Sequence, residues 1–168
     1  QVIESYDESA LHKMFEQYGE VSNSKTLAKH IVTNRTHIKL NTVADFKLLI
    51  APVVKGNPNK YWAQVFQAIR IEVNEEMDAL KDLLAQLKEV VKPGGTAVVI
   101  TFHSIEDRLV KNAFRVAPEE ENEANPFLSV EREKFWKIIT KKPVVASEKE
   151  MKENNRSRSA KMRAAERL

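Results

Sequence analysis

The apolar residues in the first third of the chain recur at helical spacing. Four of them lie three or four residues apart, and they are Leu11, Met14, Phe15 and Tyr18. This spacing predicts a helix with one buried face. Ser5 and Glu8 have the spacing of a capping box at its start, and Gly19 is suited to end it.

Two more helices are expected before residue 52. The same period predicts a helix over residues 22–35 with Leu27, Ile31 and Val32 facing inward. A third helix is expected from Thr42 to the residue before Pro52, because proline interrupts a helix. We expect it to bury Val43, Phe46, Leu49 and Ile50. Residues 55–60 are polar and rich in turn formers, which predicts a linker.

A longer helical region follows and ends at Pro93, Gly94 and Gly95. Its first part carries an apolar stripe of Trp62, Val65, Phe66, Ile69 and Val73. Asn74 can cap a second part, whose inward residues are Met77, Leu80, Leu84, Leu87 and Val91.

The pattern changes after the glycines. Residues 97–100 form a short apolar run, which predicts a strand buried on both faces. A helix is expected over residues 104–115 with Ser104 as its N-cap. Strands are expected at 135–140 and 161–167, an acidic loop at 117–126 and a polar loop at 154–159. Ser147 with Glu150 caps a short helix between them.

This order of elements predicts the α/β class for the second part of the chain. Residues 1–58 are predicted as an all-helical subdomain, and residues 59–168 as an incomplete α/β core to which it is attached.

The composition of the chain limits the kinds of functional site and the cellular location that we expect. The chain has no cysteine, and His12, His30 and His37 do not have the spacing of metal ligands, so we expect no metal site. Neither a membrane-spanning apolar run nor a signal peptide is visible, so a cytoplasmic location is expected. The net charge is only +3, but basic residues crowd the stretch 156–167. The chain starts with Gln1, which suggests part of a longer protein.

A polar cluster follows the strand at 97–100. His103, Glu106 and Asp107 lie where ligands gather in α/β proteins, at the carboxyl end of a strand. His103 could hydrogen-bond a ligand, or it could fix the turn as a structural histidine. At least one of the two carboxylates is explained by the helix dipole, and the other could accept a proton or orient His103. These three are the candidate catalytic residues.

The candidate RNA contacts lie near the C-terminus. They are Asn154, Arg156, Arg158, Ser159, Lys161 and Arg163, of which the cations suit phosphate oxygens. Alternation along a strand would place Lys161 and Arg163 on one face. The alternative is a solvated basic tail. Lys25, Lys29, Arg35 and Lys39 could form a second patch, for which a solvated helix face is the favoured interpretation.

Three sequence blocks resemble one enzyme family. The first block is residues 66–76, FQAIRIEVNEE. The second combines Pro93-Gly94-Gly95 with FHSIEDR at 102–108. The third is Lys142-Pro143 followed by NNRSRSAKMRAAER at 154–167. Together they resemble the MraW/RsmH methyltransferases, which use S-adenosylmethionine to methylate N4 of a cytidine in bacterial small-subunit rRNA.

The resemblance implies an incomplete Rossmann-like core with a helical insert. The family's glycine-rich cofactor turn is not matched in this sequence, which has four glycines in other settings. We therefore expect the C-terminal part of such an enzyme, no cofactor-binding residues in this chain, and no activity of the chain alone. The expected partner is small-subunit rRNA or the assembling small subunit. A non-catalytic RNA-binding or assembly module is the alternative. In the family's fold the strand at 97–100 lies inside the sheet, so its bare edge here predicts a homodimer.

Overall fold

The computed structural model describes residues 2–115 and 134–168, which form two compact units. Unit 1 is Gln1–Glu76 and unit 2 is Met77–Leu168. The acidic loop expected at 117–126 lies outside the described residues. No helix in the described ranges is both long and apolar enough to cross a membrane.

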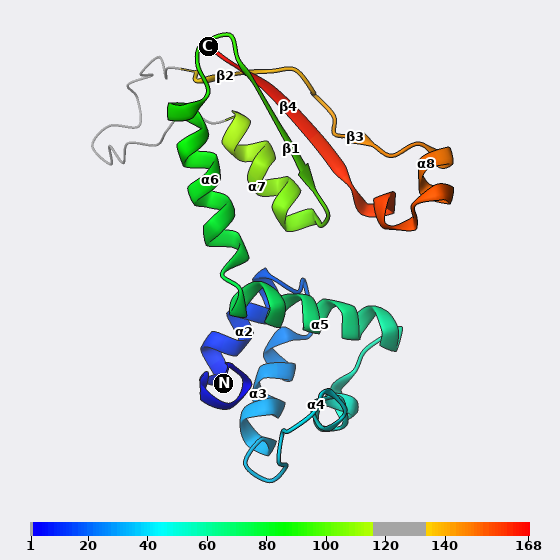
Figure 1. Ribbon diagram of the computed structural model, residues 1–168. Coiled ribbons are helices and arrows are strands. Elements are labelled where there is room, and N and C mark those ends of the chain that lie inside the picture. Colours follow the sequence, from blue (N-terminus) through cyan, green and yellow to red (C-terminus); the bar gives the residue numbers. More distant parts are fainter. Residues whose placement is uncertain (1, 116–133) are drawn as a thin grey trace, which may run out of the picture. The chain divides into compact units, whose positions relative to one another are not determined.

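Unit 1 is helical (Figure 1). Its elements are α1 (Val2–Ser5), α2 (Glu8–Gln17), α3 (Ser24–Asn34), α4 (Val43–Ile50), the 3-10 helix η1 (Ala51–Val53) and α5 (Pro58–Val73). Leu11 and Phe15 of α2 and Leu27 and Ile31 of α3 are fully buried, because each helix turns its apolar stripe to a common core. The helix α5 adds Val65 and Ala68 to that core. Unit 1 therefore extends to Glu76, beyond residue 58, where the sequence predicts the boundary.

The helix ends differ from the sequence prediction in two places. The expected capping box of Ser5 and Glu8 is wrong, because Asp7 is the N-cap of α2 and accepts a hydrogen bond from the Ala10 N–H at 2.7 Å. The predicted linker at 55–60 contains the start of α5, since Asn57 caps that helix. Thr42, where the sequence predicts the third helix to start, is the N-cap of α4 and forms a capping box with Asp45.

Two buried stripes were also predicted wrongly in part. Val43 is 59% exposed, because it is the first residue of α4 and points away from the core. On α5 the fully buried stripe is Tyr61, Val65, Ala68 and Ile71. It is rotated from the predicted one, so Val73 is 61% exposed.

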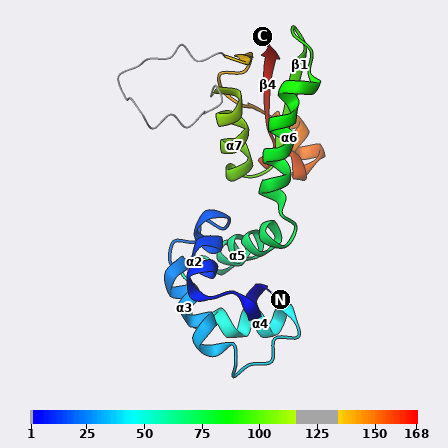
Figure 2. The same cartoon turned by 90° about the vertical axis from the view of Figure 1, so that its left-hand side faces the viewer.

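Unit 2 packs two helices on a four-stranded antiparallel sheet. Its helices are α6 (Glu76–Val90), which begins at the unit boundary, α7 (Ser104–Arg115), α8 (Glu148–Glu153) and the 3-10 helix η2 (Asn155–Ser159). Its strands are β1 (Thr96–Thr101), β2 (Trp136–Ile138), β3 (Val144–Val145) and β4 (Lys161–Arg167). The order is β1-β4-β2, and β3 also pairs with β4. Figures 1 and 2 show α6 and α7 over the same face of this sheet.

The core of unit 2 lies between that face and the two helices. Leu84 of α6 and Val110 of α7 pack with Ala97 of β1 and Ala165 of β4, which are register partners. The expected strand at 97–100 is confirmed, but its burial on both faces is wrong. Val98 and Ile100 point to the other face and are 55% and 56% exposed. The expected polar loop at 154–159 is mostly η2.

The mixed helix and sheet content agrees with an α/β methyltransferase fold. The helix at 104–115, the strand at 161–167 and the short helix capped by Ser147 are confirmed.

We predict that Asn57→Ala destabilises unit 1 by about 1 kcal/mol, because it removes the N-cap of α5. The Asn57 side chain accepts from the Lys60 N–H at 3.2 Å. In a Trp136→Phe background, Trp62 on α5 is the sole tryptophan and reports urea unfolding. Asn59→Ala is the control, since Asn59 is exposed inside the first turn of the same helix. Equal stability of the two variants would contradict the capping role.

Candidate functional site

The turn after β1 is held by His103 and Glu106. His103 precedes the first residue of α7 and takes the N-cap position. Its Nδ1 atom accepts the Glu106 N–H at 3.3 Å. The Glu106 Oε2 atom in turn accepts the N–H groups of Phe102 at 2.8 Å and His103 at 3.2 Å. This is a reciprocal capping box with histidine in the place of serine, so the expectation that Ser104 is the N-cap is wrong by one residue.

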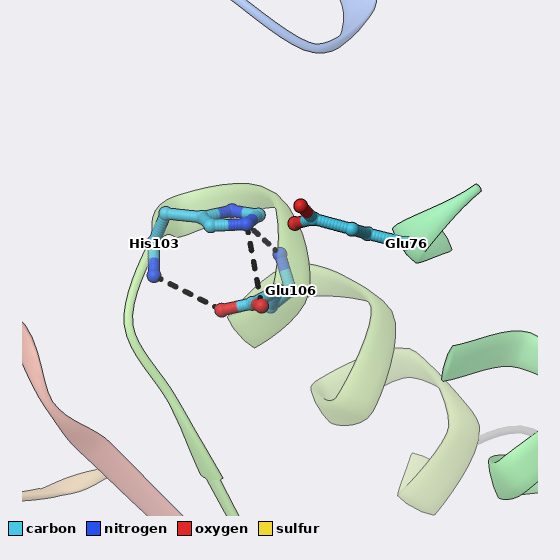
Figure 3. Close-up of side chains that lie close together, drawn as sticks. All are labelled: Glu76, His103 and Glu106. Carbon is cyan, nitrogen blue, oxygen red and sulfur yellow. Dashed lines mark hydrogen bonds and ion pairs between the residues drawn. The ribbon is translucent and has the colours of Figure 1, made fainter. Parts of the chain in front are cut away.

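The same contacts indicate which nitrogen of the neutral imidazole ring carries the proton. Because Nδ1 accepts a backbone hydrogen bond, the proton of the neutral ring is on Nε2. Nε2 lies 3.3 Å from Glu106 Oε1, as Figure 3 shows. The ring is therefore oriented by the hydrogen bond at Nδ1, and the carboxylate that lies beside Nε2 is that of Glu106. Glu76, also labelled in Figure 3, belongs to unit 1 and accepts hydrogen bonds there from Arg70 and Asn74.

Asp107 has a different environment. It is 9% exposed, and its carboxylate accepts from Arg163 Nε at 2.7 Å and Arg163 Nη2 at 3.0 Å. Lys161 Nζ is 3.9 Å away. The hydrogen bonds from Arg163 lower the pKa of Asp107, although burial opposes that shift. A carboxylate held in its charged form by a bidentate arginine is a weak proton acceptor.

The six predicted RNA contacts are divided by the structure. Asn154, Arg156, Arg158 and Ser159 are exposed around η2. Lys161 and Arg163 share one face of β4, as strand alternation predicts, because both reach Asp107. Arg163 is only 7% exposed, so its guanidinium lies inside unit 2. The ion pair between Asp107 and Arg163 was not predicted from the sequence. An aspartate in the first turn of a helix and an arginine on a strand were the signals that could have suggested it.

Asn154 shapes the exposed segment. Its Oδ1 atom accepts the Arg156 N–H at 3.2 Å, and its carbonyl accepts both the N–H and the hydroxyl of Ser157. Ser157 is 6% exposed, and its burial turns Arg156 and Arg158 outward on either side of it. The arginines are thus presented by a folded turn rather than by an extended tail.

Known proteins similar to this chain are rRNA methyltransferases. Residues 1–168 match the MraW methylase family. The protein named ribosomal RNA small subunit methyltransferase H of Azobacteroides pseudotrichonymphae is 45% identical over 99% of this chain. Its namesakes in Bacteroides fragilis strain YCH46 and Chloroherpeton thalassium are 43% and 44% identical, over 98% and 100% of the chain. The chain spans about half the length of these relatives, 54–55%.

We predict that Arg163→Met destabilises unit 2 by about 3–5 kcal/mol, because it leaves Asp107 charged and buried without its partner. Lys161→Met is the matched control on the same strand face. The ion pair of Lys161 with Asp107 is longer and more exposed, so it contributes under about 1 kcal/mol to the free energy of unfolding. Urea unfolding followed by Trp136 fluorescence, in a Trp62→Phe background, measures both. The combination Asp107→Leu with Arg163→Met should recover most of the loss, and equal effects of the two methionine variants would contradict the assignment.

The pH dependence has a defined sign. The pKa of Asp107 is lowered in the folded chain. Its contribution to stability is therefore complete above the pKa of the unfolded chain, about 3.9. It is lost as the pH falls through the lower folded value. Arg163→Met should remove this part of the acid dependence, and an unchanged dependence would contradict it.

Proposed function

We propose, from the premise that the chain belongs to the MraW methylase family, that it is part of an enzyme that methylates N4 of a cytidine in small-subunit rRNA. The match over the whole chain to rRNA methyltransferases carries this proposal. The methyl donor is S-adenosylmethionine, and the enzyme acts in the cytoplasm of bacteria. In this proposal unit 1 corresponds to a helical insert, and unit 2 to part of a Rossmann-like core.

The residues around the end of β1 do not fit a cofactor site by themselves. A cofactor of this class needs backbone that it can approach closely, which glycines after a strand usually supply. After β1 the chain continues with Phe102 and His103 instead. The cavity beside Arg163 and Lys111 has a volume of only about 10 Å³, which is room for one water at most. We therefore place the cofactor site largely on the other part of the enzyme and propose no cofactor ligand here.

The described residues instead support roles around the RNA. The turn at 102–106 is held by reciprocal hydrogen bonds, because the His103 ring accepts the Glu106 N–H and the Glu106 carboxylate accepts the His103 N–H. We propose that it lies beside the target base, with His103 as the group that contacts it. Methylation of an amine releases a proton, and the acceptor must be close to that nitrogen. Asp107 is the weakest of the three candidate acceptors, because Arg163 holds its charge.

The RNA-contact surface that we propose is Asn154, Arg156, Arg158, Ser159 and Lys161. Its arginines are exposed, and their charges suit phosphate oxygens. The buried Arg163 can contribute to RNA binding only indirectly, because its ion pair with Asp107 holds β4 against α7. A non-catalytic RNA-binding module would use the same surface, so RNA affinity alone does not distinguish such a module from a methyltransferase. An assay of methyl transfer distinguishes them.

We expect this chain alone to show no methyl transfer, and a hybrid enzyme to show it. In the hybrid, the chain replaces the matching segment of the Bacteroides fragilis relative. Labelled S-adenosylmethionine and small ribosomal subunits are the substrates, and mass spectrometry of the nucleosides identifies the product as N4-methylcytidine. A folded hybrid that binds the cofactor but methylates no RNA would favour the non-catalytic alternative. Activity of the chain alone would contradict our placement of the cofactor site.

The same assay tests His103. Asparagine is a good N-cap, so His103→Asn keeps the start of α7 but removes the imidazole. We expect stability to change by less than about 1 kcal/mol and methyl transfer to fall roughly a hundredfold. Ser104→Ala is the neighbouring control at the first helical position. Full activity of the asparagine variant would leave His103 with the capping role alone.

The edge of β1 supports one further expectation from the sequence. Within the described residues β1 pairs only with β4, so one side of the strand has backbone groups available for another strand. We propose that the isolated chain forms a homodimer through this edge. Sedimentation velocity over a range of concentrations tests it, and a monomer at the highest concentration would contradict it.

A further inference from the structure

Unit 1 has a strongly uneven charge distribution. The stretch 21–71 contains eight lysines and arginines but a single carboxylate, that of Asp45. That carboxylate is already used, since it accepts the N–H groups of Asn41 and Thr42 at the start of α4. The other acidic residues of this unit lie in the first 20 residues and after residue 71. The stretch that forms α3, α4 and most of α5 is therefore cationic, although unit 1 carries equal numbers of acidic and basic residues.

An open groove lies within this cationic stretch. It has a volume of about 500 Å³ and is lined by residues 35–41 together with Glu4. Lys39 and His37 are exposed at the groove. Two permanent positive charges, on Arg35 and Lys39, thus face the one carboxylate of Glu4. A groove with this charge suits an anion better than a neutral ligand.

Arg35 is fixed in place without losing its charge. Its Nη1 atom donates to the carbonyl oxygens of Ile3 at 2.9 Å and Tyr6 at 2.6 Å. Both acceptors are neutral, so these bonds orient the guanidinium without neutralising its positive charge. In the described part of the chain, Arg35 has no carboxylate within ion-pair distance. Orientation before binding lowers the entropy that a ligand contact would cost.

The lysines of α3 extend this surface. Lys25 and Lys29 are exposed and lie four residues apart, so they share one side of the helix. The helix α3 ends at Asn34, and the lining of the groove begins with the next residue, Arg35. Positive side chains therefore continue from α3 to the groove, which is the arrangement that follows a polyanion rather than a single ion.

We propose that this groove and the lysines of α3 form a second RNA-contact surface, which binds the phosphate backbone of the rRNA by charge. The proposal rests on the proposed function, in which RNA is the substrate. It adds residues of unit 1 to the RNA contacts, none of which belongs to the η2 segment of unit 2. Because this surface contacts phosphates, it contributes affinity and register on the RNA rather than base specificity.

The test compares two charge reversals on the intact 168-residue chain. Lys39→Glu changes the groove, and Lys13→Glu makes the same charge change on the exposed side of α2, outside the cationic stretch. Affinity for a fluorescent single-stranded RNA from the small-subunit decoding region is measured by anisotropy over a range of salt concentrations. We expect Lys39→Glu to weaken binding about tenfold and to flatten the salt dependence. Lys13→Glu should change the affinity by less than about twofold.

The outcomes are distinguishable from those of the proposed function. Equal losses of RNA affinity in the two variants would show that only the net charge matters, and they would contradict the proposal that the groove binds RNA. Loss on replacing Arg156 and Arg158 by alanine, with no change in Lys39→Glu, would keep the η2 surface and reject the groove. No RNA binding by the unaltered chain would reject both surfaces, while the hybrid assay would still decide catalysis. Lys29→Glu on α3 serves as a second variant if Lys39→Glu alters the circular dichroism of the chain.

Discussion

The buried ion pair between Asp107 and Arg163 is the constraint on which unit 2 depends. It joins the first turn of α7 to the middle of β4 at 2.7 Å. Arg163 is also the register partner of Val99 in β1, so the pair ties one helix to both long strands. Moving β4 by one residue would turn this guanidinium to the other face and leave a charge buried without its partner. The pair thus selects one register, which the small alanines of the ladder could not do alone.

That constraint also separates the roles of three neighbouring polar residues. Asp107 is committed to the sheet, Glu106 to the backbone of the turn, and His103 to the cap of the helix. The turn is fixed by hydrogen bonds that do not involve a ligand. It is therefore organised without a ligand, so a group that bound there would meet side chains that are already oriented.

Much of the fold follows from the sequence because its signals are local. The apolar period of α2, the cap at Thr42, the break at Pro93 and the strand at 161–167 are each visible within a few residues. The wrong predictions have two causes, since some elements are positioned by contacts made far along the chain and some helix caps use a neighbouring side chain that the pattern did not single out. The register of α5 is set by packing against α2, and the cap at His103 needs a side chain whose capping use is unusual. The sequence places the candidate site at the end of β1, and the structure brings His103 and Glu106 together there. The burial of Arg163 was not predicted, because its partner lies 56 residues away.

Every ladder in the described sheet contains β4. The strands β1, β2 and β3 all pair with it, and none of them pairs with another. During synthesis the ribosome therefore releases α6, β1 and α7 well before the strand that joins them, with about 60 residues between partners such as Thr101 and Lys161. The helices of unit 1 complete their core from nearby segments and can fold while the rest is being made. Until residues 161–167 emerge, the apolar side of β1 has no partner among the described strands, so this is the interval in which unit 2 is most prone to aggregate.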